Sequence, residues 1–273
     1  MDIRLDTYRK LDLAGLPSRR VDVWLPPEYA EQPEKRFPVL YMHDGQNVFK
    51  GRPSIGPGWQ VTENISALSQ QGAISAPIVV GMTSTLNRIG DYMPQKAYDK
   101  PGAAAMVEKH FNHLPHLPIN VVSDLYLEWI VKLVKPLIDR TYRTLAGPEH
   151  TVMMGSSMGG LISIYGLCEY PDVFGAAGCL STHWPVLGDA MLDYLREALP
   201  LAGRLRLYFD HGTTDLDASY APWQEMADQI ILEKGYQLDQ DFVSLVFPGA
   251  GHHERFWAER LQIPLTFLFG RPA

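Results

Sequence analysis

Residues 151–160, with the sequence TVMMGSSMGG, place the motif Gly-x-Ser-x-Gly between the apolar run TVMM and the helix-like segment LISIYGLCEY. The motif alone is common, but a strand before it and a helix after it are typical of a nucleophile elbow, the strained turn that lifts a serine above the edge of a sheet. We expect small residues at 155 and 159, because this turn brings its backbone close to its neighbours. The context predicts Ser157 as a nucleophile, ahead of Ser156. The plain alternative is a glycine-rich turn that only packs a helix on a strand.

Strand-like and helix-like segments alternate on both sides of this turn. The region from about 6 to 26 has a two-residue period and ends at Pro26-Pro27, which predicts a β-hairpin. Further short apolar runs predict buried strands at 38–42, 76–82, 151–154, 175–180, 205–209 and 242–247. Helical periods lie between them, at about 58–70, 122–142, 158–170, 187–199, 221–234 and 254–268. The pattern predicts one α/β domain over 1–273, with an N-terminal antiparallel hairpin, a mostly parallel central sheet and helices on both faces.

Two regions depart from this alternation of strand-like and helix-like segments. Pro136 falls inside the predicted helix 122–142 and is expected to kink it. Residues 83–121 contain four prolines and show no clean period, and a loop of that length is typical of a lid or a binding loop. The lid-like segment holds three histidines at three-residue spacing, but its prolines argue against a single helix presenting all of them, and no metal site is expected. These histidines are His110, His113 and His116.

Composition excludes several classes of function. The net charge of −7 gives no reason to expect a nucleic-acid partner, which would favour a basic face. No apolar run reaches the roughly 18 residues of a membrane span, and the charged start MDIRLDTYRK lacks the apolar core of a secretory signal. Cys168 and Cys179 lie in apolar segments and are expected to be buried thiols rather than a disulfide. Together these features favour a cytoplasmic protein with no membrane partner.

A serine hydroxyl needs a base to take its proton, and in folds with this elbow an acid and then a histidine follow the serine along the chain. The last predicted strand ends in Gly-Ala-Gly-His252-His253-Glu254, and we expect His252 to be the base and His253 to begin the next helix. Asp215 and Asp217 both lie in the loop after the strand LRLYFDH, and either fits the acid. Asp210, inside that strand, is expected to be structural.

Four segments in register resemble the putative-esterase family of α/β-hydrolases, which includes esterase D-like enzymes, feruloyl and acetyl-xylan esterases and siderophore esterases. The segments are LYMHDGQNVF (40–49), VVGMTSTLNRIGDYMP (79–94), LVKPLIDRTYRTL (133–145) and GSSMGGLISIYGLCEYPDVFGAAGCLS (155–181). The resemblance extends over roughly 18–268. It implies an α/β-hydrolase fold that hydrolyses esters.

The resemblance also implies roles for residues of this chain. Ser157 would be the nucleophile and His252 the base. The family's G-T-x-x-L-D pattern favours Asp217 over Asp215 as the acid, although some members work with serine and histidine alone. One oxyanion donor would be the N–H of Met158 at the start of the helix after the elbow. The turn His43-Asp44-Gly45-Gln46 would supply the second, from Gln46. The candidate substrate-contacting residues are Trp59, Tyr92, His183 and Trp184, with packing in the core as the alternative for the aromatic ones.

The sequence therefore predicts a serine esterase that forms an acyl-enzyme and needs no metal and no organic cofactor. An acylated sugar or another small ester is the expected substrate, and self-association stays open. Two alternatives share the fold: an acyltransferase, in which an alcohol replaces water, and a catalytically silent binding protein. The presence of a nucleophile, a base and two candidate acids in the expected order disfavours the silent protein.

Overall fold

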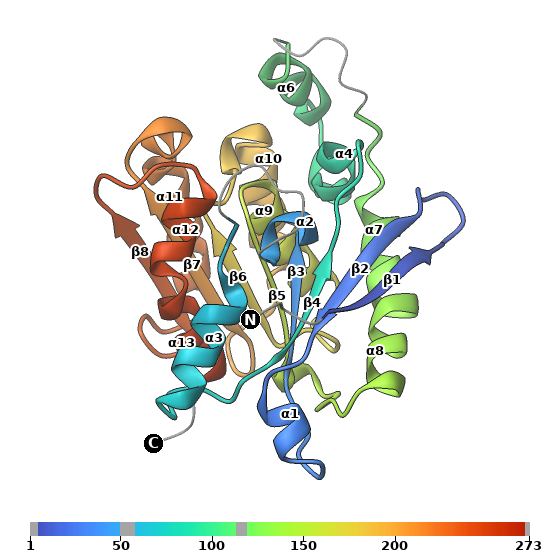
Figure 1. Cartoon of the computed structure of the whole chain (residues 1–273). Coiled ribbons are helices and arrows are strands. Elements are labelled where there is room, and N and C mark those ends of the chain that lie inside the picture. The colour runs from blue at the N-terminus through green and yellow to red at the C-terminus, as the bar shows by residue number, and fades with distance from the viewer. Residues whose placement is uncertain (1–4, 50–57, 113–118, 271–273) are drawn as a thin grey trace.

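The computed structural model describes residues 5–49, 58–112 and 119–270. Within them the strands are β1 (Asp6–Leu11), β2 (Arg19–Trp24), β3 (Val39–His43), β4 (Ile78–Met82), β5 (Thr151–Ser156), β6 (Ala176–Leu180), β7 (Arg206–Gly212) and β8 (Phe242–Phe247). They form one eight-stranded sheet in the order β1-β2-β4-β3-β5-β6-β7-β8 (Figure 1). β2 is antiparallel to both β1 and β4, and all other pairs are parallel. The predicted fold class, with its N-terminal hairpin, is confirmed.

Helices connect most of the strands, and all of those named next except the short helices α1 and α2 lie close to predicted positions. They are α1 (Glu28–Glu31), α2 (Gly45–Val48), α3 (Val61–Gln70), α7 (Ser123–Trp129), α8 (Lys135–Thr141), α9 (Met158–Glu169), α10 (Asp189–Ala198), α11 (Ala221–Glu233), α12 (Glu254–Arg260) and α13 (Gln262–Phe269). Among the described residues, no helix is both long enough and apolar enough to cross a membrane. Cys168 and Cys179 are buried free thiols, as predicted.

Prolines explain two departures from the predicted helices. Between α7 and α8, the segment Ile130–Val134 is π-helical, so the interruption expected at Pro136 takes the form of a wider turn just before it. The single helix predicted over 254–268 is wrong, because the chain breaks at Leu261 into α12 and α13. Pro264 has no N–H to donate to the carbonyl of Arg260, and its ring would clash with that carbonyl in a continuous helix. In the first turn of a new helix a proline costs little.

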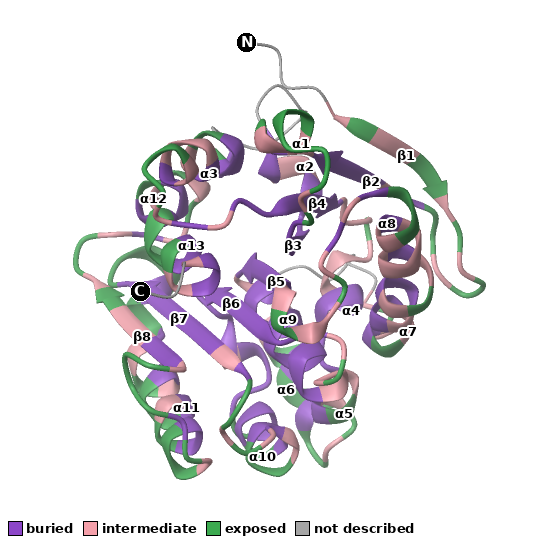
Figure 2. Ribbon diagram, turned by 90° about the horizontal axis from the view of Figure 1, so that it is seen from below, coloured by how far each residue is buried: buried purple, intermediate pink, exposed green. Residues whose placement is uncertain are grey.

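Residues of one strand alternate between two hydrophobic cores, one on each face of the sheet. In β3, Val39 and Tyr41 belong to one core, and Leu40 and Met42 belong to the other. This two-residue alternation is the geometry of a strand, and burial on both faces is why the strands read as continuous apolar runs. α3, α12 and α13 cover one face, and α7 to α11 lie on the other (Figure 2).

The segment 83–121, expected to be an irregular lid-like loop, contains three short helices. They are α4 (Arg88–Tyr92), α5 (Gln95–Tyr98) and α6 (Ala103–His110). α4 and α6 lie beyond the carboxyl ends of the parallel strands (Figure 1), the position expected of a lid. His113 and His116 lie outside the described residues, and the described part of the chain brings no three His, Cys, Asp or Glu side chains together as a metal site.

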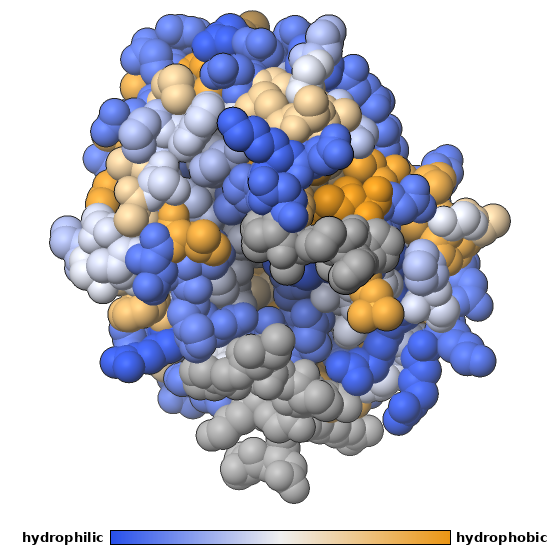
Figure 3. Space-filling model, turned by 90° about the horizontal axis from the view of Figure 1, so that it is seen from above, coloured by the Kyte–Doolittle hydropathy of each residue, from blue (hydrophilic) through white to orange (hydrophobic). Residues whose placement is uncertain are grey.

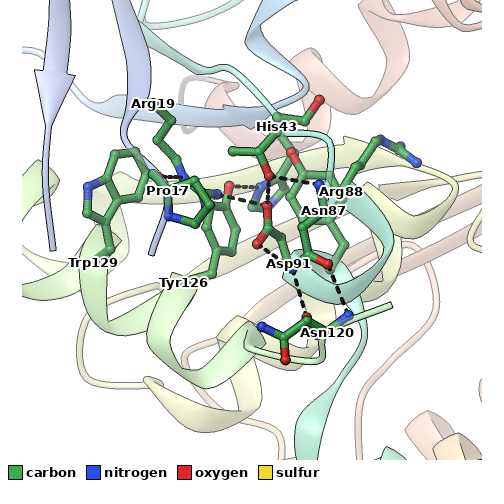
Figure 4. Close-up of polar contacts among 12 residues, drawn as sticks. Pro17, Arg19, His43, Asn87, Arg88, Asp91, Asn120, Tyr126 and Trp129 are labelled. Atoms are coloured by element: carbon green, nitrogen blue, oxygen red, sulfur yellow. Dashed lines mark hydrogen bonds and ion pairs between the residues drawn. The ribbon is translucent and has the colours of Figure 1, made fainter. Parts of the chain in front are cut away.

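Buried polar contacts attach the start of this segment to the sheet (Figure 4). Asp91 of α4 forms an ion pair with Arg19 of β2 at 3.3 Å, and both side chains are almost fully buried. The Arg19 guanidinium lies over the rings of Tyr126 and Trp129. Asn87 donates a hydrogen bond to the carbonyl of Asn120 at 2.7 Å, which joins the two ends of the segment. The base of the lid is therefore fixed to β2 and α7.

Candidate active site

Ser157 stands at the sharp turn between β5 and α9, in a strained backbone conformation with positive φ (φ 59°, ψ −124°). A non-glycine residue adopts a positive φ only when the surrounding structure enforces it, at a cost of about 1–3 kcal/mol. Here the Ser157 N–H donates to the carbonyl of Leu180 in β6 at 2.9 Å. This is the geometry of a nucleophile elbow, and it leaves the serine partly exposed while Ser156 is buried.

The two glycines of the motif are not equally constrained. A Cβ on Gly155 would lie 2.8 Å from backbone atoms of Gly159, whereas a Cβ on Gly159 would meet its nearest atom, Cβ of His43, at 3.4 Å. The first distance is a clash that only a backbone shift can relieve, and the second is near an ordinary contact. The expectation that both positions require a small residue therefore holds strictly at 155 alone.

Gly155→Ala is expected to lower the free energy of unfolding by about 1–3 kcal/mol, the usual cost of inserting a methyl group into a closely packed site. Urea denaturation followed by circular dichroism measures this loss. Gly159→Ala is the matched control, with an expected loss below about 1 kcal/mol, because helix propensity favours alanine over glycine there. Equal stabilities of the two variants would contradict the tight approach at Gly155.

Asp217 and His252 meet beside the elbow. Oδ1 of Asp217 lies 2.6 Å from Nδ1 of His252, and Oδ2 accepts hydrogen bonds from the Gly212 N–H at 2.7 Å and the Ser181 hydroxyl at 2.6 Å. Burial alone would raise the pKa of Asp217, but the hydrogen bonds from His252, Ser181 and Gly212 outweigh it and lower the pKa. An ionised carboxylate only accepts, so the His252 proton sits on Nδ1 and Nε2 is left as a proton acceptor.

Asp215 and His253, the rivals from the sequence, point elsewhere. The backbone 215–219 forms a 3-10 turn, so Asp215 and Asp217 do not share one side as they would in an extended loop. The Asp215 side chain is exposed, and its carboxylate lies over the backbone of Gly251. His253 caps α12 by accepting a hydrogen bond from the Arg255 N–H at 3.1 Å, at the helix start where the sequence placed it.

Buried groups behind Asp217 hold its carboxylate in place, and most of them could not be predicted from the sequence. The Ser181 hydroxyl, which donates to Asp217, accepts hydrogen bonds from Trp257 Nε1 at 2.9 Å and from Arg260 at 3.1 Å. Arg260 also forms a buried ion pair with Asp210 at 2.7 Å, which gives Asp210 the structural role expected of it. The spacing of Trp257 from the histidine could have marked that residue. Ser181 and Arg260 carry no such signal, because their contacts join distant parts of the chain.

The turn after β3 lies next to the start of α9. Asp44 has φ 55°, and its carboxylate receives two hydrogen bonds of 2.7 Å from Arg88 of the lid. Burial would raise the pKa of Asp44, but Arg88 outweighs burial and lowers it. A Cβ on Gly45 would lie 2.5 Å from the backbone of Gly81, so this position requires glycine. The Gln46 side chain bonds to Ser84 in both directions, at 2.9 and 3.1 Å, which fixes the turn.

A small cavity of about 220 Å³ opens over the nucleophile, at the carboxyl ends of the strands. It is lined by Arg88, Ile89, His110, Phe111, Ser157, Met158, His183 and Leu216. Lid residues and elbow residues therefore share one cavity. Seen from above, this end of the molecule is mostly hydrophilic, with hydrophobic side chains in separate patches (Figure 3).

Of the four residues expected to contact substrate, His183 lines this cavity and the other three are buried in the protein. Trp59 stacks on Trp257 with ring centroids 5.5 Å apart. Tyr92 accepts a hydrogen bond from the Asp44 N–H at 3.1 Å, and so supports the turn from below. Trp184 donates to Gln224 at 2.9 Å within the core.

No direct hydrogen bond joins Ser157 and His252, both of which are described residues. The Ser157 side chain is instead a polar neighbour of the Tyr220 hydroxyl and opposes the effect of burial on the pKa of that hydroxyl. The Tyr220 ring packs edge-on against His252 with centroids 5.7 Å apart. Catalytic hydrogen bonds are often long or misaligned before a substrate binds. The sequence did not point to Tyr220, which is one of many tyrosines and stands in no motif.

The fold and the elbow define an α/β-hydrolase. A family model described as "Putative esterase" matches residues 17–267, and the chain belongs to this family. It is thus a carboxylic ester hydrolase, as the sequence predicted. Among curated proteins, the uncharacterized protein YbbA of Bacillus subtilis (strain 168) is 25% identical over 260 residues, which cover 93% of this chain and 94% of that protein.

Solved structures share the fold at lower identity. A ferulic acid esterase superimposes with a TM-score of 0.68 at 18% identity, covering 97% of each chain. An IroE-like serine hydrolase from Shewanella oneidensis gives 0.69 at 18% identity, covering 97% of this chain and 79% of that one. The enterobactin esterase of Shigella flexneri gives 0.67 at 17% identity, and although 98% of this chain is covered, it spans 59% of that enzyme's chain.

Proposed function

We propose that the protein hydrolyses a small carboxylic ester through an acyl-enzyme on Ser157, with His252 as general base and Asp217 as the acid that orients it. The observation that carries this proposal is the 2.6 Å bond between Asp217 and Nδ1 of His252, placed beside a serine at φ 59°. It leaves Nε2 of His252 free to take a proton. Family membership supports ester hydrolysis but does not assign these roles.

The geometry supports a two-step reaction. In the first step His252 Nε2 takes the Ser157 proton while Oγ attacks the ester carbon, and the carbonyl π electrons move onto oxygen. The N–H of Met158, at the positive end of α9, would stabilise that oxyanion together with the N–H of Gln46 from the turn after β3. Collapse expels the alcohol, which takes the proton from His252. Water then attacks the acyl-enzyme with His252 again as base.

The cavity over Ser157 supports a small ester as the substrate, such as a sugar that carries a short acyl group. The cavity over Ser157 has about 220 Å³, the share of roughly seven water molecules, which suits a short acyl chain.

Trapping the acyl-enzyme tests the proposal. Rapid mixing with p-nitrophenyl acetate is expected to give a burst of p-nitrophenol close to one equivalent per enzyme. After acid quenching, peptide mass spectrometry should find the acetyl group on Ser157, and a fluorophosphonate should label the same residue. A label on Ser156 would contradict the elbow assignment, and no label on either serine would favour the silent binding protein. Acetyl transfer to an added alcohol in preference to water would favour the acyltransferase.

A further inference from the structure

Tyr220 places a buried hydroxyl directly against the proposed nucleophile. It precedes α11, and 1% of its surface is exposed. Its hydroxyl lies 2.5 Å from Nδ1 of His183 and has the Ser157 side chain as a polar neighbour that lowers its pKa. On the far side of that ring, Nε2 of His183 lies 2.9 Å from Nε2 of His110, the last residue of α6 in the lid. Hydrogen bonds therefore run from the lid through His183 to the Tyr220 hydroxyl, beside the nucleophile, without passing through His252.

The order of the strands puts Tyr220 on the same side of Ser157 as His252. Ser157 follows β5, Tyr220 lies after β7 and His252 after β8, whereas the turn that carries Gln46 follows β3, on the opposite side of β5. In ester cleavage the carbonyl oxygen faces the oxyanion donors, and the leaving oxygen faces the base that protonates it. A hydroxyl that reaches Ser157 from the β7 side therefore lies beside the leaving oxygen.

The protonation states along the chain let Tyr220 act as a donor. Burial, reinforced by His110 and His252, lowers the pKa of His183 to about 3, so its ring is neutral near pH 7. Burial also raises the pKa of Tyr220, which keeps its proton. A neutral imidazole has one N–H. When His110 donates to Nε2 of His183, Nδ1–H donates to the Tyr220 oxygen, and the phenol proton is directed toward Ser157.

We propose that Tyr220 is a further catalytic residue, whose hydroxyl donates a hydrogen bond to the leaving oxygen of the ester, and that His183 is a positioning residue which orients this hydroxyl. The inference rests on the proposed function and adds a contact to its first step. As the tetrahedral intermediate collapses, the carbon–oxygen bond breaks and its electron pair goes to the leaving oxygen. That oxygen takes its proton from His252, while Tyr220 keeps its own and shares it as a hydrogen bond.

The dependence of rate on the leaving group tests this role. Tyr220→Phe keeps the ring against His252 and removes only the hydroxyl. A good leaving group carries its charge without help, so kcat/KM for p-nitrophenyl acetate is expected to fall less than about threefold, since one neutral hydrogen bond is worth about tenfold at most. For ethyl acetate, whose leaving oxygen is strongly basic, the expected loss is about 10- to 100-fold, approaching that of a lost oxyanion donor. Phenyl acetate should lie between them.

Tyr194→Phe is the matched control. Tyr194, in α10, is also buried, and its hydroxyl donates to Glu169 at 2.7 Å; its loss should leave all three rates unchanged. His183→Ala should reproduce the leaving-group trend of Tyr220→Phe more weakly, and His183→Asn, which keeps a donor near Nδ1, should restore part of the rate. The His183 pair carries the test if Tyr220→Phe proves unfolded by circular dichroism.

Equal losses with all three esters would show that Tyr220 only supports packing around Ser157, and unchanged rates would show that its hydroxyl is idle. Either result overturns the inference without touching the proposed function. The proposed function fails on a different measurement, namely retention of activity by an enzyme that lacks the Ser157 hydroxyl.

Discussion

Ser157→Ala is expected to lower kcat for ester hydrolysis by about 10⁶, the typical cost of losing the nucleophile of a triad. No other described hydroxyl is placed at the tip of the elbow, so nothing can take over the attack on the ester carbon. The folded state should survive, because the Ser157 N–H that donates to Leu180 belongs to the backbone. Steady-state rates with p-nitrophenyl acetate, alongside circular dichroism spectra, measure both quantities.

Ser156→Ala provides the control. Ser156 is the last residue of β5 and is buried, so the Ser156→Ala variant should keep nearly all of the wild-type activity. More than a few per cent of wild-type activity in Ser157→Ala would refute the assignment of the nucleophile. If the activity left in Ser157→Ala disappeared in the double variant that also carries Ser156→Ala, Ser156 would be the nucleophile.

Asp217→Asn is expected to lower kcat by about 10⁴, as the loss of the carboxylate does in other triads. An amide at this position would present an N–H toward Ser181, Gly212 or His252, all of which donate to Asp217 in the native protein. If the amide oxygen of the Asp217→Asn variant accepts from Ser181 and Gly212, its N–H faces Nδ1 of His252 and donates to it. The imidazole proton then sits on Nε2, and His252 can no longer take the proton of Ser157. Initial rates measured at saturating substrate give the comparison.

Asp215→Asn is the matched control, two residues away. The Asp215 carboxylate is exposed, and exposed charges contribute little energy. We therefore expect kcat to change by less than about twofold. A large loss at 215 with little loss at 217 would reverse the assignment. Near-full activity in both variants would mean that serine and histidine act without an acid.

The sequence predicted the sheet well because the strands are buried on both faces. Their apolar runs, the hairpin period at the N-terminus and the elbow motif are local signals, and each survives into the structure. The helix predicted over 254–268 failed at Pro264, whose effect on the carbonyl of Arg260 outweighed the helical period. The short helices α4 to α6 were missed, since segments of one or two turns show too few repeats to reveal a period.

The acid shows where sequence reasoning reaches its limit. Asp215 and Asp217 both fit the spacing, and only the 3-10 turn that buries one and exposes the other separates them. The contacts that select Asp217 come from Ser181, Gly212 and His252, at the carboxyl ends of three different strands. The same limit applies to the aromatic candidates, because a tryptophan in a cavity wall and one in the core read alike in a sequence.

The backbone of Ser157 limits which chemistry evolution or design could install at this turn. A branched β-carbon is strongly disfavoured at φ 59°, so threonine cannot replace serine there without reshaping the loop. Cysteine has the same unbranched geometry and would keep the side chain beside His252. The elbow can therefore hold a cysteine nucleophile in place of Ser157 but not a threonine one. This restriction comes from one dihedral angle and not from the reactivity of the side chains.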